Sequence, residues 1–447
     1  MNRIAILVTS FLLLVATGAS GQIAVNISAR NRSTGEPVTI NTVARPEGRL
    51  VMQTAPDPAT GQRLILSYAD LRKYEFIPGT IESLWQFKML ESKVYDGLLG
   101  SGYHYDRRYA MEEKMKEFLA TAEQNGSFYI DSYLESRLYG ILRMVYPVRH
   151  TDRRPGVLSL LILSDITPDA WVGPDGTMVI TTGMITALNS ELELMALMAQ
   201  EVAHFALDHH MTNYSNLLLT GTGLALGNVI RYSLQQELKA DQCAVSVLEG
   251  YGESPAALGS MLRKVLAYGE QMGNYYLGST MGFFPDAASR AAAYPDTLIY
   301  LSADYERLIA PVISFNAVSA YNQSQYLLCR LLLERNIASG QASADDLVIL
   351  SQAMMRLSGS DDEDEKALSV VRSVTGRSQE APPGAFKQEA LLLLRLERRS
   401  EAEIALAKYE EALGREEQQY ASIAGDWSQM ISYLASEKEW VKRTRRR

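Results

Sequence analysis

Residues 200–204 read QEVAH, and a helix through them places positions 200 and 204 on one face. Two histidines at this spacing can hold one Zn²⁺, and a glutamate between them then lies next to the metal-bound water. Glu201 and the second histidine, His204, are present, but the first position is Gln200. The stretch is therefore compatible either with a hydrolytic metal site or with the remnant of one.

A second helical stretch carries two more acids four positions apart, Glu237 and Asp241. Its apolar residues follow helical spacing and predict that it packs inward: Leu234, Leu238, Val245 and Leu248. Inward-facing carboxylates are costly unless they are paired or bound to a metal. Glu237 is thus a candidate third metal ligand, and without a metal both acids could form a buried hydrogen-bonded cluster with Gln200.

The remaining histidines do not replace the missing ligand. They stand at positions 104, 150, 209 and 210. The last two follow His204 by five and six residues and so lie off its helix face. The first two have no motif around them, and we expect surface or hydrogen-bonded roles for them. Asp208, four residues past His204, would hold only a metal displaced by one turn, away from Glu201.

Apolar periodicity predicts an α+β fold that is mostly helical. Residues 22–68 look extended, and RLVMQT and RLILSY flank the turn-rich APDPATGQ, which predicts a hairpin. Helical spacing begins near residue 80 and is interrupted by short strand-like runs at 157–164, 171–172 and 178–182. Ser190, with Glu193 three residues later, predicts a helix start.

The C-terminal part reads as almost wholly helical beyond residue 300. Residues 217–230 are apolar but too few to span a membrane, and we expect one buried helix there. The acidic run at 361–365 predicts a solvated loop. Residues 385–413 resemble one tetratricopeptide-type hairpin, and an ordinary helical bundle fits equally well. The predicted divisions are 1–21, 22–68, 69–300 and 301–447: a signal peptide, an extended segment, the domain with the candidate site and a helical region.

The first 21 residues have the order of a secretory signal, with Arg3, an apolar run at 4–16 and small residues at 19–21. We therefore expect a periplasmic or secreted protein without a membrane span in the mature chain. Cys243 and Cys329 are compatible with one disulfide or with two separate thiols. The net charge of -9 argues against nucleic-acid binding, and we expect the basic tail at 442–447 to be a solvated, frayed terminus.

Three segments in order carry a family resemblance: DAWVGPDGTMVITTG at 169–183, ELELMALMAQEVAHFALDH at 191–209 and ELKAD at 237–241. Over about residues 157 to 295 the chain resembles the zinc metallopeptidase family of HtpX and the CAAX prenyl endopeptidases, including its soluble periplasmic members. The resemblance implies a zincin-like metallopeptidase domain with a small sheet, which acts on polypeptides.

The resemblance also implies a role for each matching residue. His204 and Glu237 would be zinc ligands, with Gln200 at the position of the third, and Glu201 would be the general base that takes a proton from zinc-bound water. Asp241 would orient His204 through its remaining N–H. Zinc is the implied cofactor.

Further matches lie outside the metal ligands. His209 matches a family histidine that does not bind the metal. The strand that would pair with an extended substrate peptide consists of Ala170, Trp171 and Val172.

The chain also departs from the family pattern. Gln200 replaces a zinc histidine, and a glutamine carbonyl is a weak, uncharged ligand. Asp169 replaces the usual asparagine before the strand. In MGFFPDAASRAAAY, Arg290 is in register with the family, but Phe284 stands where a histidine is usual.

Three functions remain open from the sequence. The first is an exported metallopeptidase-family protein that acts on misfolded or envelope proteins with a zinc site impaired by Gln200. The second is a fully active zinc metalloendopeptidase. The third is a non-catalytic chaperone or assembly factor that binds extended peptide segments, with a further protein partner at its C-terminal helices.

Overall fold

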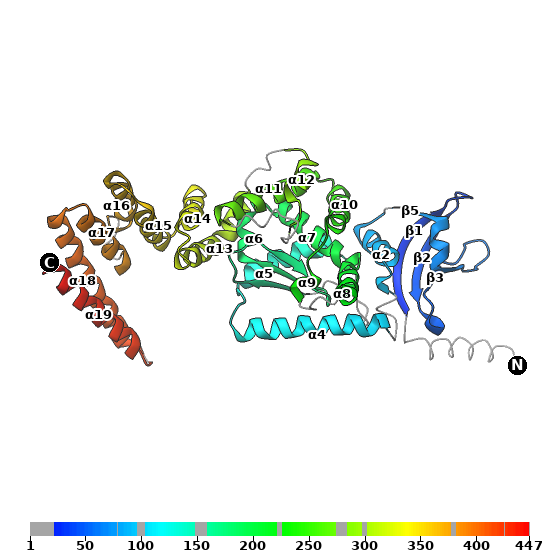
Figure 1. Cartoon of the computed structure of the whole chain (residues 1–447), viewed down its shortest axis with the longest axis horizontal. Coiled ribbons are helices and arrows are strands. Elements are labelled where there is room, and N and C mark those ends of the chain that lie inside the picture. The colour runs from blue at the N-terminus through cyan, green and yellow to red at the C-terminus, as the bar shows by residue number, and fades with distance from the viewer. Residues whose placement is uncertain are drawn as a thin grey trace. The chain divides into compact units, whose positions relative to one another are not determined.

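The computed structural model describes residues 22–77, 79–95, 103–147, 159–220, 226–273, 284–296, 302–376, 381–423 and 425–446. The predicted signal sequence and His150 lie outside these residues. The chain divides into two compact units, residues 1–302 and 303–447, and each is described by itself. The described residues are mostly helical with two small sheets, as expected for the α+β class (Figure 1).

The first sheet is antiparallel, with strand order β4-β3-β2-β1-β5. Its strands are β1 (Gln22–Asn31), β2 (Pro37–Ala44), β3 (Val51–Thr54), β4 (Ile65–Ser67) and β5 (Tyr74–Phe76). The predicted hairpin is confirmed, since Met52 on β3 lies opposite Leu66 on β4. Two short 3₁₀ helices connect the strands, Pro46–Gly48 and Tyr68–Lys73. Helix α2 (Ile81–Glu91) contacts β1 of this sheet.

The second sheet has the order β6-β8-β7, with β6 (Ser159–Leu163), β7 (Ala170–Val172) and β8 (Thr177–Thr181). Strand β8 pairs parallel with β6 and antiparallel with β7, so β7 is an edge strand. The helices of this part are α4 (Tyr103–Gln124), α5 (Ser132–Val145), α6 (Thr182–Ala187), α7 (Glu191–Ala206), α8 (His209–Thr220), α9 (Leu226–Val229), α10 (Leu234–Gly250), α11 (Ala256–Gln271) and α12 (Ala287–Ala292).

Helix α7 lies at the centre of the first unit. Ser190 caps it by accepting a hydrogen bond from the backbone N–H of Glu193, as the sequence predicts. The Glu193 carboxylate accepts from the backbone N–H of Asn189 rather than that of Ser190. The helix contacts α2, α5, α10, α11 and β7, and every α7 residue from Glu193 onward is buried. Each polar side chain on α7 therefore needs a partner inside the protein.

The prediction of one buried helix at 217–230 is wrong in the described residues. Helix α8 ends at Thr220, and residues 221–225 lie outside the described part of the chain. Leu219 is 86% exposed. A single apolar face is enough to hold α8 against the core, so its leucine-rich end can lie in solvent. None of the helices in the described part of the chain is long and apolar enough to cross a membrane.

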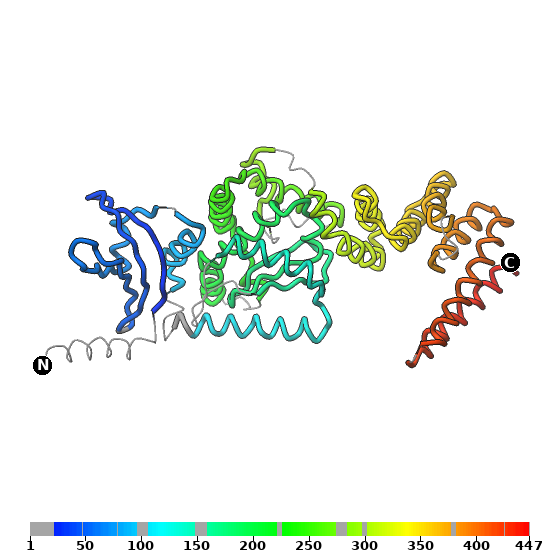
Figure 2. The backbone as a smooth tube through the Cα atoms, turned by 180° about the vertical axis from the view of Figure 1, so that it is seen from behind, coloured from blue at the N-terminus to red at the C-terminus, as the bar shows by residue number. Residues whose placement is uncertain are grey.

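The second unit is a succession of helices in which each contacts the next (Figure 2). They are α13 (Ala303–Asn322), α14 (Tyr326–Ala338), α15 (Ala344–Leu357), α16 (Asp361–Thr375), α17 (Pro383–Arg395), α18 (Arg399–Ser422) and α19 (Ser428–Arg445). Contacts also join α13 to α15 and α15 to α17. Small and leucine side chains fill the core between α15 and α19.

Two predictions for the second unit are wrong. The acidic run at 361–365 is not a loop but the first turn of α16, where acidic side chains favour the positive end of the helix dipole. Asp364 in this run is buried and lies 2.6 Å from Arg395 Nε. The basic tail is not frayed through its described length, because α19 continues to Arg445 and that side chain lies 2.7 Å from Glu410.

Candidate functional site

Helices α7 and α10 pack against each other and bring the predicted site residues together. The Gln200 side-chain amide donates a hydrogen bond to Glu237 Oε2 at 2.7 Å. His204 Nε2 lies 3.7 Å from Glu237 Oε1, which is too long for a hydrogen bond. The i,i+4 spacing on α7 thus places both side chains opposite one carboxylate on α10.

Arg290 on α12 completes this cluster. Its Nη1 lies 2.8 Å from Glu237 Oε2, and its Nε and Nη2 donate to the two oxygens of Asp241 at 2.8 and 2.7 Å. The guanidinium is buried, with the side chain 1% exposed. A buried bidentate pair of this kind is well matched in geometry and charge. The sequence placed Arg290 in register with the family but gave it no role.

The two ring nitrogens of His204 have different surroundings from those predicted. Its Nδ1 lies 2.9 Å from Nδ1 of His209, so His209 rather than Asp241 contacts this ring. Its Nε2 makes no hydrogen bond with the described residues. The ring of Tyr232 stacks on His204 with centroids 3.7 Å apart and planes inclined by 17°. Tyr232 thereby covers one face of the imidazole, which nothing in the local sequence pattern indicated.

His210 links this cluster to the predicted substrate strand. Its Nε2 lies 2.7 Å from the backbone oxygen of Val172 and 2.8 Å from the Tyr232 hydroxyl. A carbonyl oxygen can only accept, so Nε2 carries the ring proton. The imidazole therefore donates to the outer edge of β7. The sequence predicts that His210 lies off the helix face of His204 and indicates no role for it.

The register of the sheet shows which groups on β7 face outward. Gly173 N–H donates to Thr177 O and Thr181 N–H donates to Asp169 O, so the alternation of an antiparallel ladder turns the N–H and C=O of Val172 away from β8. Ala170, Trp171 and Val172 are all buried. The outward-facing carbonyl group of Val172 already accepts a hydrogen bond from His210.

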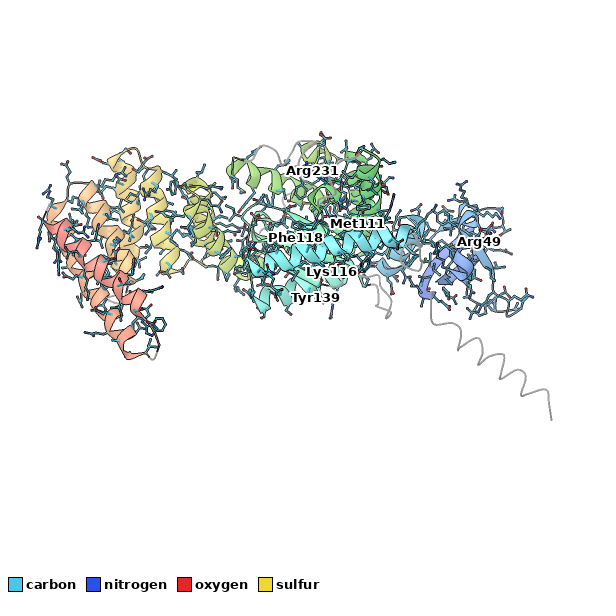
Figure 3. All side chains as sticks on the ribbon, turned by 60° about the horizontal axis from the view of Figure 1, so that its bottom comes forward. Arg49, Met111, Lys116, Phe118, Tyr139 and Arg231 are labelled. Atoms are coloured by element: carbon cyan, nitrogen blue, oxygen red, sulfur yellow. The ribbon has the colours of Figure 1, made fainter. Side chains whose placement is uncertain are left out.

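Helix α4, which carries Met111, Lys116 and Phe118 as labelled in Figure 3, also packs on this strand. Trp171 makes an edge contact with Phe118 of α4, with centroids 5.9 Å apart. Met115 of α4 belongs to the same cluster, together with Val179 and Tyr232. A Cβ at Gly173 would lie only 2.9 Å from Met115 Sδ, so the glycine permits this close approach. Strand addition at β7 would have to displace contacts that are already made.

Burial controls the protonation of the cluster. Burial, followed by the charge of Glu237, raises the pKa of Glu201 well above its ordinary value, which favours the protonated form of its carboxyl group. Burial also raises the pKa of Glu237 to about 7, although Arg290 opposes this. Burial lowers the pKa of His204 well below its ordinary value. The imidazole is thus neutral.

Burial also sets the pKa values of the residues that flank this cluster. Burial lowers the pKa of His209 to about 2 and that of His210 to about 3. Burial raises the pKa of Asp169 to about 8, and the charge of Asp169 contributes to the raised pKa of Glu201. Asp169 and Glu201 are therefore close enough to disfavour ionisation of both at once.

The donor set does not fit a catalytic zinc ion. Such a site has three protein ligands and one open position. Here the strong donors are His204 Nε2 and Glu237 Oε1, and the third position is the Gln200 amide. Within the described ranges no group of three His, Cys, Asp or Glu side chains is placed to hold a metal ion. Arg290 already supplies a positive charge to Glu237 at 2.8 Å.

Residues 153–229 match the model of peptidase family M48. The matched range contains β6 to α9 and includes Gln200, Glu201 and His204. It ends before α10 and α12, which carry Glu237 and Arg290. A comparison with curated proteins found no match. This part of the chain is thus similar to the metallopeptidases of that family.

Proposed function

We propose that this protein is an exported member of the metallopeptidase family that handles misfolded or envelope proteins by binding them, with its zinc site impaired by Gln200. The polypeptide class follows from the peptidase family that residues 153–229 match. Export follows from the signal-like order of residues 1–21. The likeness to HtpX-type enzymes rests on the sequence segments around 169–183, 191–209 and 237–241.

The contact between Gln200 and Glu237 carries the proposal. The amide N–H of Gln200 donates a hydrogen bond to Glu237 Oε2, and the guanidinium of Arg290 forms an ion pair with the same oxygen. A carboxylate that already receives an amide donor and a guanidinium is neutralised without a metal ion. The charge of Glu237 is therefore balanced within the cluster, which favours a stable core over a reactive centre.

Glu201 is poorly suited to act as a base in this setting. Glu201 is buried, with 4% of the residue exposed, and burial raises its pKa well above the ordinary value. The protonated carboxyl group that this favours is too weak a base to take a proton from water. The ring of Tyr232 stacks on the imidazole of His204, which is fully buried. What this unit retains is the edge strand β7, whose outward groups at Val172 suit an extended peptide once His210 moves away.

One observation favours the second candidate, a fully active zinc metalloendopeptidase. His204 Nε2 and Gln200 Oε1 are buried and have no hydrogen-bond partner among the described residues. Unpaired buried polar atoms are costly, and a cation beside Glu237 would satisfy both if His204 carries its proton on Nδ1. His204, Glu237 and the Gln200 carbonyl would then be the ligands. Zinc would supply an activated water molecule in such a site.

Repair of the missing ligand separates the two candidates. The variant Gln200→His restores three strong ligands, and we expect it to gain tight zinc binding and proteolysis of an unfolded substrate such as casein. Gln235→His is the matched control, because it adds a histidine at an exposed position of α10. A double variant, Gln200→His with Glu201→Gln, should keep the metal and lose the proteolysis.

The outcomes are distinct. If unmodified protein cleaves casein as fast as the Gln200→His variant, the glutamine is an adequate ligand and the proposed impairment is wrong. If the repaired protein binds no more zinc than the Gln235→His control, Glu237 does not act with His204 as a ligand pair. N-terminal sequencing of the natural protein tests export, with a first residue near Gln22 expected and an intact Met1 contradicting it.

A further inference from the structure

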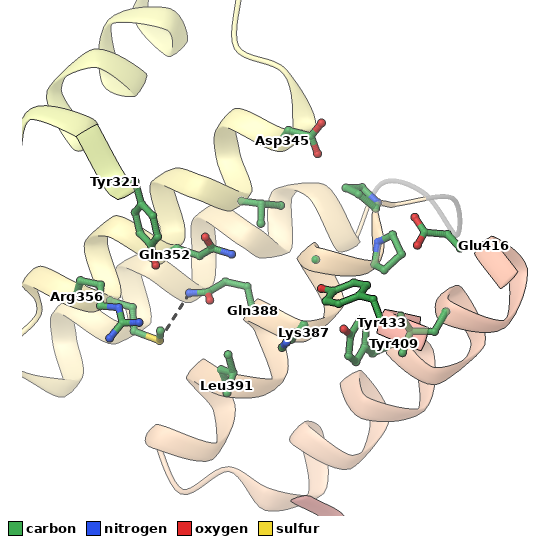
Figure 4. Close-up of a pocket in the computed structure, with 16 residues that line it drawn as sticks. Tyr321, Asp345, Gln352, Arg356, Lys387, Gln388, Leu391, Tyr409, Glu416 and Tyr433 are labelled. Atoms are coloured by element: carbon green, nitrogen blue, oxygen red, sulfur yellow. Dashed lines mark hydrogen bonds between the residues drawn. The ribbon is translucent and has the colours of Figure 1, made fainter. Parts of the chain in front are cut away.

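A pocket of about 480 Å³ lies in the second unit on the face formed by α15 and α17 (Figure 4). Residues of α13, α18 and α19 complete its walls. Aromatic and proline side chains supply much of its surface: Tyr321, Tyr409, Tyr433, Pro382 and Pro383. Such rigid faces gain contact area with little loss of side-chain entropy, which is typical of protein-recognition surfaces. The pocket is built from helices that the peptidase-family match does not include.

The two cations in the pocket have different partners. Lys387 Nζ lies 2.5 Å from Glu437 and is already neutralised. Arg356 is exposed, and its side chain is hydrogen-bonded to the hydroxyl group of Tyr321. Among the described residues Arg356 has no carboxylate partner, whereas the nearby Arg395 and Arg372 are paired with acids. Arg356 is therefore a cation available to an external anion.

Two glutamines lie between these charged groups. Gln388 on α17 is 1% exposed, yet its amide nitrogen has only long contacts, 3.4 Å to Ser351 Oγ and 3.7 Å to Met355 Sδ. Gln352 on α15 lines the same pocket (Figure 4). A side-chain amide offers one donor group and one acceptor, as a peptide group does. The amide nitrogen of Gln388 is thus only weakly bonded within the protein.

We propose that this pocket binds an extended segment of a client polypeptide that carries an acidic side chain. The client carboxylate pairs with Arg356 beside the Tyr321 hydroxyl, and the client backbone pairs with the amides of Gln352 and Gln388. A helical segment would not offer its backbone groups to these amides, because they are bonded within the helix.

The lining disfavours ligands that carry several negative charges more than a segment that carries one. Asp345 and Glu416 also line the pocket, and their charges oppose a polyanion such as a nucleic acid. A small dicarboxylate would pair with Arg356 but would leave the tyrosine and proline faces uncovered. Peptide binding at this pocket does not require the Gln200 cluster to bind zinc or to lack it. This inference therefore goes beyond the proposed function.

The test uses the full-length protein and two pools of dye-labelled random decapeptides. One pool has a fixed central glutamate and the other a fixed central glutamine. We expect tighter binding of the glutamate pool, measured by fluorescence anisotropy. Arg356→Gln should weaken that binding roughly tenfold to a hundredfold, as expected for a charge-assisted hydrogen bond, and remove the difference between the pools. Arg330→Gln, which removes an exposed-side, acid-paired arginine of α14 outside the pocket, is the charge-matched control and should change nothing.

Several results would overturn the proposal. Equal binding of the two pools, or equal losses in the Arg356 and Arg330 variants, would mean that Arg356 recognises no peptide carboxylate. Displacement of the peptides by millimolar succinate would identify a small-acid site instead. Gln388→Leu, checked for folding by its melting temperature, should weaken the binding of both peptide pools to the same degree. Unchanged binding would show that the Gln388 amide does not bond to the client backbone. Val172→Pro in the first unit should leave the difference between the pools intact, so failure here is separate from failure of the proposed function.

Discussion

Glu237 Oε2 accepts a hydrogen bond from the side-chain amide of Gln200 at 2.7 Å, at a depth where both side chains are almost fully buried. A histidine at position 200 would offer the same carboxylate a ring nitrogen and could share a metal ion with it. The glutamine instead donates to the carboxylate directly. One residue on α7 thus decides whether α7 and α10 are joined through a metal ion or through hydrogen bonds.

Arg290 should contribute strongly to stability. Arg290→Met removes the partner of two buried carboxylates, Glu237 and Asp241, and the loss should be about 3–5 kcal/mol at pH 8. The loss should shrink at pH 5, because burial already raises the pKa values of both acids and protonation relieves the unpaired charges. Urea unfolding at the two pH values measures this.

The matched control is Arg137→Met, which removes an arginine whose side chain is 50% exposed beside Glu191. An exposed ion pair contributes about 0–1 kcal/mol, so this variant should be near neutral. Equal losses in the two variants, or a larger loss for Arg290→Met at pH 5 than at pH 8, would contradict the buried-charge account.

Asp169 should make the stability of the first unit depend on pH. Burial raises the pKa of its carboxyl group to about 8 in the folded protein, above the ordinary value of 3.8. The folded state therefore holds this proton more tightly than the unfolded chain. The stability from this group is complete below pH 3.8 and is lost as the pH rises through about 8.

Asp169→Asn removes that dependence, because an amide does not titrate. The variant should become more stable than the natural protein as the pH rises from 4 to 8, and the advantage should level off above pH 8. Thermal unfolding across this range gives the difference. A difference that does not vary with pH would mean that Asp169 is ionised in the folded protein.

The edge of β7 should respond in opposite directions to two substitutions. Val172→Pro removes an N–H that faces away from β8, so it should weaken binding of an extended peptide. His210→Phe removes the donor to the Val172 carbonyl and should strengthen binding. Both are measured with the glutamine-centred peptide pool in a background that carries Arg356→Gln and Gln388→Leu, which together weaken peptide binding at the pocket of the second unit.

Folding of each variant is checked by circular dichroism. Unchanged affinity in both folded variants would show that peptides do not pair with this strand. A gain with Val172→Pro or a loss with His210→Phe would place the bound segment elsewhere on the unit.

The sequence predicts local features of the fold better than contacts between distant segments. The four-residue spacings on α7 and α10 indicate which side chains face each other, and Gln200, His204 and Glu237 do meet. Arg290 and Asp241 are 49 positions apart, and helical periodicity carries no information about such a contact. The stacking of Tyr232 on His204 is hidden for the same reason.

Charge and hydropathy were also misleading in two places. The acidic run at 361–365 predicts a loop if each charge needs water, but a helix N-terminus accommodates several acids, and Arg395 neutralises Asp364. The apolar run at 217–230 predicts a buried helix, yet Leu219 is largely exposed. Pattern alone does not show which neighbours a segment will have.

The zinc content of the unmodified protein tests the central claim most directly. The full-length protein is purified without chelators and dialysed against a slight excess of zinc, and the free metal is removed by gel filtration. Elemental analysis then gives the zinc bound per chain. The account predicts a value near zero for the natural protein and near one for Gln200→His. A value near one for the natural protein, abolished by His204→Ala, would contradict the account and show that Gln200, His204 and Glu237 hold zinc together.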